Sequence, residues 1–248
     1  MTFTIAVAGK GGVGKTSIAA LAVRHLHERT GEVVLAVDAD PNANLHSKLD
    51  VPPGRTMGDL REEIVSRGEE PPAGVSKHDY VDYHARLALA EGDGFDLLTM
   101  GRPEGPGCYC YVNNILRTFV DSLSDRYAFV VIDNEAGMEH LSRRTTRSSD
   151  LLAVVCDTSK AAFDSALRIV SLAREMDISL GRAVLVRNLA DGEDLTVPEG
   201  FDAAYAVRRS ARITSGNRET ESLRQIPSTD PALRDVADMI ERERAIRS

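Results

Sequence analysis

Short strand-like runs of apolar residues alternate along this chain with stretches of helical periodicity. The strand-like runs cover residues 3–8, 33–37, 95–100, 127–132, 151–155 and 182–186. Most of them are continuously apolar, which is typical of strands that helices cover on both faces. Hydrophobic residues recur at helical spacing in residues 13–28, 57–66, 111–123, 161–175 and 231–244. This order predicts an α/β fold with a mostly parallel central sheet and helices on both faces.

The chain contains no internal repeat, low-complexity tract or long linker that would divide it. A Gly/Pro-rich break at residues 69–74 interrupts the pattern only locally. A length of 248 residues allows one large hydrophobic core. We therefore expect residues 1–248 to form a single domain.

Charge and composition exclude several classes of protein. The chain has 30 Lys and Arg against 38 Asp and Glu, a net charge of −8, which disfavours a protein whose main task is to bind nucleic acid. Its longest apolar run is far shorter than the roughly 20 residues of a membrane helix, and its start lacks the pattern of a signal peptide. Three cysteines are too few for a disulfide framework. These features predict a cytoplasmic protein that contacts neither nucleic acid nor membrane.

Residues 9–16, GKGGVGKT, follow the first predicted strand and open the first predicted helix. They match the P-loop pattern in the structural context that this motif requires. Its glycines let backbone N–H groups surround a phosphate, Lys15 neutralises the β- and γ-phosphate oxygens, and the Thr16 hydroxyl binds Mg²⁺. The alternative, a glycine-rich turn without a ligand, explains neither Lys15 nor the acidic residues downstream. The residues predicted to bind ATP in this loop are Gly11, Gly12, Val13, Gly14, Lys15, Thr16 and Ser17.

Three aspartates follow predicted strands and are candidates for magnesium binding and catalysis. Asp38 and Asp40 follow the second strand, and Asp133 directly follows the predicted strand at residues 127–132. Because the carboxyl ends of parallel strands meet at one edge of a sheet, these side chains are expected beside the P-loop. We predict that Asp38 and Asp133 join Thr16 at magnesium and that Asp40 orients the attacking water. Asp38 is the alternative for that role, and a turn former or helix cap is the non-functional reading of these residues.

A lysine directly after the first glycine, Lys10, is not part of an ordinary P-loop. The pattern resembles the deviant Walker A motif of the nitrogenase-iron-protein, MinD and ParA superfamily. The resemblance implies a dimer in which Lys10 reaches the partner's phosphates, where a cation stabilises the transition state once two subunits close. It also implies that residues 38–40 and 133–137 are switch I and switch II, and that Asn188 recognises adenine. The alternative for Lys10 is a solvated loop lysine.

Cys108 and Cys110 precede the predicted helix at residues 111–123. At the irregular start of a helix both sulfurs can turn to one side, and nearby N–H groups favour their thiolates. Two thiolates are half of a tetrahedral site, and a symmetric dimer supplies the other two. Zn²⁺, or Ni²⁺ in a square-planar arrangement, suits such ligands. The alternative is a pair of idle thiols, and Cys156, after an apolar run, is expected in the core.

Residues 100–110 and 133–145 resemble the nickel-insertion ATPases of carbon monoxide dehydrogenase maturation, the CooC type, and the similarity extends to about Pro231. The resemblance implies an ATP-hydrolysing homodimer that holds nickel at its paired cysteines and assists metal insertion into carbon monoxide dehydrogenase. One alternative is a maturation ATPase for another nickel or iron–sulfur enzyme. The other is a MinD/ParA-like positioning or partition switch, although the C-terminal residues 240–248 lack a clear membrane-binding apolar face.

Overall fold

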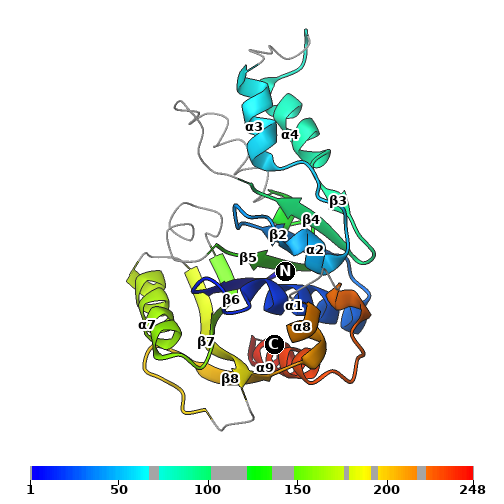
Figure 1. The fold of residues 1–248 in the computed structure, drawn as a ribbon. Helices are drawn as coiled ribbons and strands as arrows, with labels where there is room; N and C mark the ends of the chain where they lie inside the picture. Colours follow the sequence, from blue (N-terminus) through cyan, green and yellow to red (C-terminus); the bar gives the residue numbers. More distant parts are fainter. Residues whose placement is uncertain are drawn as a thin grey trace.

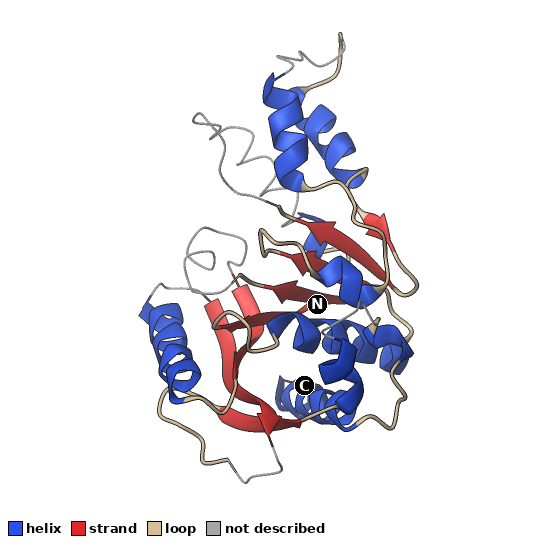
Figure 2. Ribbon diagram, in the orientation of Figure 1, coloured by secondary structure: helices blue, strands red, loops and turns tan. Residues whose placement is uncertain are grey.

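The computed structural model describes residues 2–66, 73–101, 122–135, 148–175, 179–190, 195–216 and 222–247. Its described strands form one eight-stranded sheet in the order β3-β4-β2-β5-β1-β6-β7-β8 (Figures 1 and 2). All neighbouring strands pair in parallel except β3 and β4, which are antiparallel. The predicted α/β fold with a mostly parallel sheet is confirmed.

The central strands are those that the apolar runs predicted. They are β1 (Phe3–Gly9), β2 (Val34–Asp38), β4 (Phe95–Thr99), β5 (Phe129–Asp133), β6 (Ser148–Cys156) and β7 (Ser179–Ala190). Every residue of β2 and β5 is buried. Side chains on both faces of these strands therefore pack into the core, which explains why the sequence runs are continuous rather than alternating.

Helices cover both faces of the sheet. The helix α1 (Lys15–Thr30) and the C-terminal helix α9 (Pro231–Arg247) lie on one side, and α7 (Lys160–Glu175) lies on the other (Figure 1). Met57 and Leu60 of α3 (Met57–Ser66) and Ala85 of α4 (Lys77–Arg86) join a second apolar cluster with residues of β2, β4 and β5. The predicted helices 13–28, 57–66, 161–175 and 231–244 are confirmed to within a few residues at each end.

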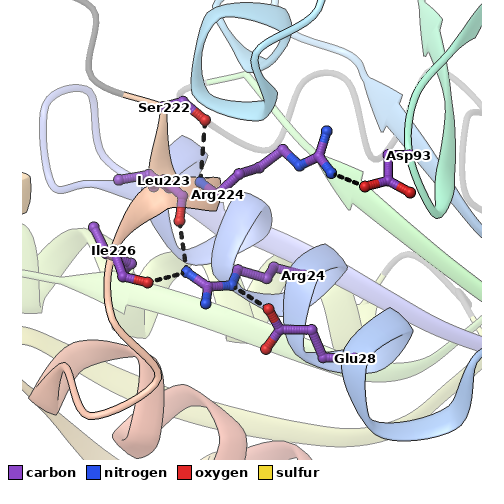
Figure 3. Close-up of polar contacts among 7 residues, drawn as sticks. All are labelled: Arg24, Glu28, Asp93, Ser222, Leu223, Arg224 and Ile226. Carbon is purple, nitrogen blue, oxygen red and sulfur yellow. Dashed lines mark hydrogen bonds and ion pairs between the residues drawn. The ribbon is translucent and has the colours of Figure 1, made fainter.

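A short 3₁₀ segment, η1 (Leu223–Gln225), makes polar contacts both with α1 and with the turn that precedes β4 (Figure 3). The Arg24 guanidinium donates to the carbonyl oxygens of Leu223 and Ile226, at 3.0 and 2.6 Å. Arg224 of the same segment reaches Asp93, in the turn between β3 (Ala90–Glu91) and β4, at 2.5 Å. Arg24 thus gives two carbonyl groups a hydrogen-bond partner, and it ties η1 to the helix that begins at the P-loop.

Several elements lack a clear sequence signal. They are β3, α2 (Leu45–Leu49), α4, β8 (Ala203–Arg208), α8 (Ala211–Gly216) and η1. β8 is an edge strand with mostly half-buried residues, and its apolar run, AAYAV, is made mainly of small residues. β7 is also longer than the predicted 182–186. The predicted helix 111–123 and the break at 69–74 fall largely outside the described residues.

Candidate functional site

The P-loop lies between the end of β1 and the start of α1. Gly12 and Gly14 have φ angles of 82° and 96°, a left-handed region that glycine adopts without the strain of a Cβ. The Lys15 side chain is 7% exposed, and its ammonium donates to the carbonyl oxygen of Lys10 at 3.2 Å. The loop therefore folds back on its own lysine and holds the Lys15 ammonium against its backbone.

Two buried carboxylates lie at the same edge of the sheet. Asp38 of β2 and Asp133 of β5 are direct partners in the parallel pairing, and Asp133 also pairs with Val7 of β1. Asp133 is 1% exposed, and neither of its carboxylate oxygens has a hydrogen-bond partner among the described residues. Buried carboxylates are normally paired or coordinate a metal. With the Thr16 hydroxyl nearby, this oxygen-donor set suits Mg²⁺.

Burial shifts the titration of both carboxylates upward. It raises the pKa of Asp133 to about 7, an effect that the Thr16 hydroxyl and Lys15 oppose and the charge of Asp38 reinforces. It raises the pKa of Asp38 to about 6, although backbone N–H groups of Leu45 and Asp40 favour the charged form. Both carboxyl groups therefore bind protons at a higher pH than an ordinary aspartate does, and a cation that binds to them is expected to release those protons.

Asp38 and Asp40 shape the loop between β2 and α2. The two oxygens of Asp38 accept hydrogen bonds from the backbone N–H groups of Asp40, at 3.1 Å, and Leu45, at 2.9 Å. Asp40 is half-buried and accepts from the backbone N–H of Asn42 at 2.8 Å. Asp38 therefore fixes the start of α2, and Asp40 is the more accessible of the two. Their roles at magnesium and at the attacking water stay predictions.

Asn188 lies on the opposite side of β1 from Asp133, at the end of β7. Its amide nitrogen donates to the Val13 carbonyl oxygen at 2.8 Å, so this side chain contacts the P-loop directly. The adenine contact that the resemblance implies stays a prediction. Asn134, within the predicted switch II but given no role there, is fully buried and donates from its amide to the Val7 carbonyl oxygen at 3.0 Å, which links the ends of β5 and β1.

Lys10 is exposed at the mouth of the loop. Asp157, in the loop after β6, accepts a hydrogen bond from the Ser159 N–H at 2.8 Å. The hydrogen bonds from Ser159 lower the pKa of Asp157, and the nearby charge of Lys10 lowers it further. Asp157 was not among the predicted site residues, although an Asp-x-Ser sequence before a helix is a recognisable turn and cap signal. The exposed position of Lys10 leaves its ammonium accessible to a second molecule.

The predicted cysteine pair, Cys108 and Cys110, lies outside the described residues, as does most of switch II after Glu135. Cys156 is fully buried, as predicted, and burial raises the pKa of its thiol to about 11. Within the described ranges, no three His, Cys, Asp or Glu side chains cluster as a metal site. In the same ranges, no helix combines the length and hydropathy needed to cross a bilayer.

Replacing Asp133 by Asn is expected to stabilise the metal-free protein at alkaline pH. Because the folded pKa, about 7, exceeds the ordinary value of 3.8, the carboxyl favours folding at low pH, and this contribution is lost as pH rises through 7. At pH 8 in EDTA, Asp133→Asn should therefore gain a few kcal/mol in denaturant unfolding, with little difference at pH 4, roughly 1.4 kcal/mol for each unit of pKa shift.

Asp157→Asn is the control for this comparison, because the pKa of Asp157 is lowered and its loss should bring no gain at pH 8. Identical pH profiles for the Asp133→Asn variant and the parent chain would show that Asp133 is not a destabilising buried carboxylate.

Comparison with known proteins places this geometry in a family. Residues 4–227 match the family model of the CobQ/CobB/MinD/ParA nucleotide binding domain. The chain is 48% identical over 186 residues to an ATP-binding protein of Methanocaldococcus jannaschii, covering 74% of this chain and 73% of that one. It is 36% identical over 185 residues to the carbon monoxide dehydrogenase accessory protein CooC of Rhodospirillum rubrum, covering 70% of each.

Solved structures agree on the fold. A ParA family ATPase of Chlorobium tepidum superposes with a TM-score of 0.69 at 17% identity, covering 96% of each chain. MinD of Pyrococcus horikoshii, solved with Mg-ADP, superposes with a TM-score of 0.64 at 18% identity, covering 100% of this chain and 99% of that one. The chain therefore belongs to the CobQ/CobB/MinD/ParA family of ATP-binding P-loop ATPases, with the deviant Walker A lysine at Lys10.

Proposed function

We propose that this protein is an ATP-hydrolysing metallochaperone that holds nickel between two copies of the chain and assists metal insertion into carbon monoxide dehydrogenase. The observation that carries the proposal is the 36% identity to CooC over 70% of both chains, in a chain that has a Cys-x-Cys pair at Cys108 and Cys110. Family membership gives the ATPase part, and the cysteine pair gives the cargo part.

The residues at the sheet edge have separate tasks in ATP hydrolysis. Backbone N–H groups of the P-loop and the Lys15 ammonium hold the β- and γ-phosphates. Thr16 and Asp133, with Asp38 beside them, would hold Mg²⁺, which when bound neutralises charge on the phosphate oxygens. Asp40, half-buried in switch I, orients the attacking water.

Lys10 completes this site from the other subunit. Its side chain is exposed, whereas Lys15 is buried against the loop of its own subunit. A cation placed over the γ-phosphate only when two subunits close makes hydrolysis depend on dimer formation. Closure also brings two cysteine pairs within one complex, so four thiolates become available to a single metal ion.

Switch I and switch II connect the two tasks. Asp38 holds the first residue of α2, and Asp133 precedes the segment that leads toward residues 136–147. Loss of the γ-phosphate changes the charge that both carboxylates face. The proposal is that the resulting rearrangement of the two switches opens the dimer and releases nickel to the client enzyme.

The cysteine pair is tested by metal content. Protein purified without oxygen should carry one Ni²⁺ or Zn²⁺ per dimer, and Cys108→Ser or Cys110→Ser should remove it, because a half-shell of thiolates binds weakly. Cys156→Ala is the matched control: this thiol is buried at the end of β6 and should not affect metal content. Full metal stoichiometry in Cys108→Ser, measured by elemental analysis, contradicts the proposal.

The trans role of Lys10 is tested by mixing two inactive variants. Lys10→Ala and Asp40→Ala should each lose at least about a hundredfold in ATP hydrolysis, given the usual contribution of a trans cation. In a mixed dimer, the site that retains Asp40 receives Lys10 from its partner. An equimolar mixture should therefore recover about a quarter of the parent activity, since half the dimers are mixed and each has one active site.

A lysine that acts within its own subunit gives no recovery in the same mixture. Lys15→Ala replaces Lys10→Ala in a control mixture, which distinguishes loss of ATP binding from loss of the trans contact. Lys10→Ala and Asp40→Ala should each elute from a sizing column as folded protein at the same volume as the parent chain.

A further inference from the structure

The side chain of Asn188 joins the P-loop to an irregular point in β7. Its amide nitrogen donates to the Val13 carbonyl oxygen at 2.8 Å, and its amide oxygen accepts from the backbone N–H of Leu189 at 2.9 Å. The residue is 9% exposed, and 175 residues separate it from Val13. Both ends of the amide are therefore held, one by the loop and one by the strand.

Gly14 gives this amide the space that it occupies. A Cβ built on Gly14 would overlap with the amide nitrogen of Asn188. The φ of 96° at Gly14 independently favours glycine. The P-loop is thus closed over the Asn188 amide, and a larger residue at position 14 would displace it.

Local strain at Leu189 sets the direction of the amide. Leu189 has a φ of 60°, a left-handed conformation that is uncommon for a residue with a branched side chain. It lies where the pairing of β7 with β8 shifts register between Asn188 and Ala190. This bulge turns the Leu189 N–H back toward the Asn188 side chain. Strained backbone that the surrounding structure maintains is common at functional sites.

We propose that Asn188 is a positioning residue for phosphate binding, separate from any contact with the base. The Val13 carbonyl and the Gly14 N–H belong to one planar trans peptide unit, in which these two groups point in opposite directions. When Asn188 holds the carbonyl on its own side, the Gly14 N–H must face away from Asn188. The amide of Asn188 thereby fixes the orientation of a phosphate-binding donor in advance.

Inorganic tripolyphosphate separates this role from adenine recognition, because it has the phosphate chain and no base. Asn188→Ala should weaken the binding of Mg²⁺-tripolyphosphate roughly three- to tenfold, for the loss of one hydrogen bond, and that of Mg²⁺-ATP by at least the same factor. Calorimetry at fixed Mg²⁺ measures both affinities.

Asn188→Asp is the second variant, because it keeps the shape and the acceptor for Leu189 but cannot donate to the Val13 carbonyl. It should weaken tripolyphosphate at least as much as Asn188→Ala does. Ser149→Ala is the matched control, because the buried Ser149 hydroxyl also donates to a backbone carbonyl, that of Leu151, at 2.9 Å. Ser149 lies at the start of β6, whereas the P-loop lies near the other end, where Val155 pairs with Gly9. Ser149→Ala should change thermal stability without changing either affinity.

The proposal is overturned if tripolyphosphate binds both Asn188 variants as tightly as it binds the parent chain, whether or not ATP binding weakens. It depends on the P-loop as a phosphate site and not on the nickel role. Its failure would therefore leave the metal content of the cysteine variants unaffected, and the failure of the metallochaperone proposal would leave the tripolyphosphate result unaffected.

Discussion

Parallel pairing of β1 with β5 on one side and β6 on the other is the constraint on which the site depends. The register sets Val7 beside Asp133 and Gly9 beside Val155, and it continues to Asp38 on β2. Because successive side chains of a strand point to opposite faces, a slip of one residue would turn Asp133 away from its present side of the sheet. The apolar residues that fill both faces of the sheet fix that register, so the core determines where the carboxylates stand.

The same edge of the sheet concentrates features that cost folding free energy. Asp133 is buried without a hydrogen-bond partner among the described residues, and Leu189, next to the Asn188 that contacts Val13, has a positive φ angle. Groups of this kind persist where the surrounding core over-determines them. Their common location beside the P-loop indicates that the core stabilises a site made for an anion and a cation, and that bound ligands would relieve part of the cost.

Sequence patterns predicted the parts of the molecule that have local signals. Continuous apolar runs identified the central strands because burial on both faces removes the alternation, and residues 9–16 identified the P-loop because phosphate binding needs glycines and a lysine in fixed order. The contact of Asn188 with Val13 has no local signal, since it forms only when β7 packs two strands from β1. The edge strand β8 was missed because its apolar run is mainly alanine, and the charged helix α4 was missed because its few apolar residues show no clear period.

In the proposed function one copy of the chain holds an incomplete set of groups: Lys10 is exposed and acts on the partner, and Cys108 and Cys110 would supply two of four thiolates. Nickel binding of this kind therefore requires a dimer. Sedimentation velocity on nickel-loaded protein, with ADP and with a non-hydrolysable ATP analogue, measures this most directly. We expect a species of twice the 26.9 kDa chain mass that carries the nickel. Nickel held at full stoichiometry by a monomer in every nucleotide state would contradict it.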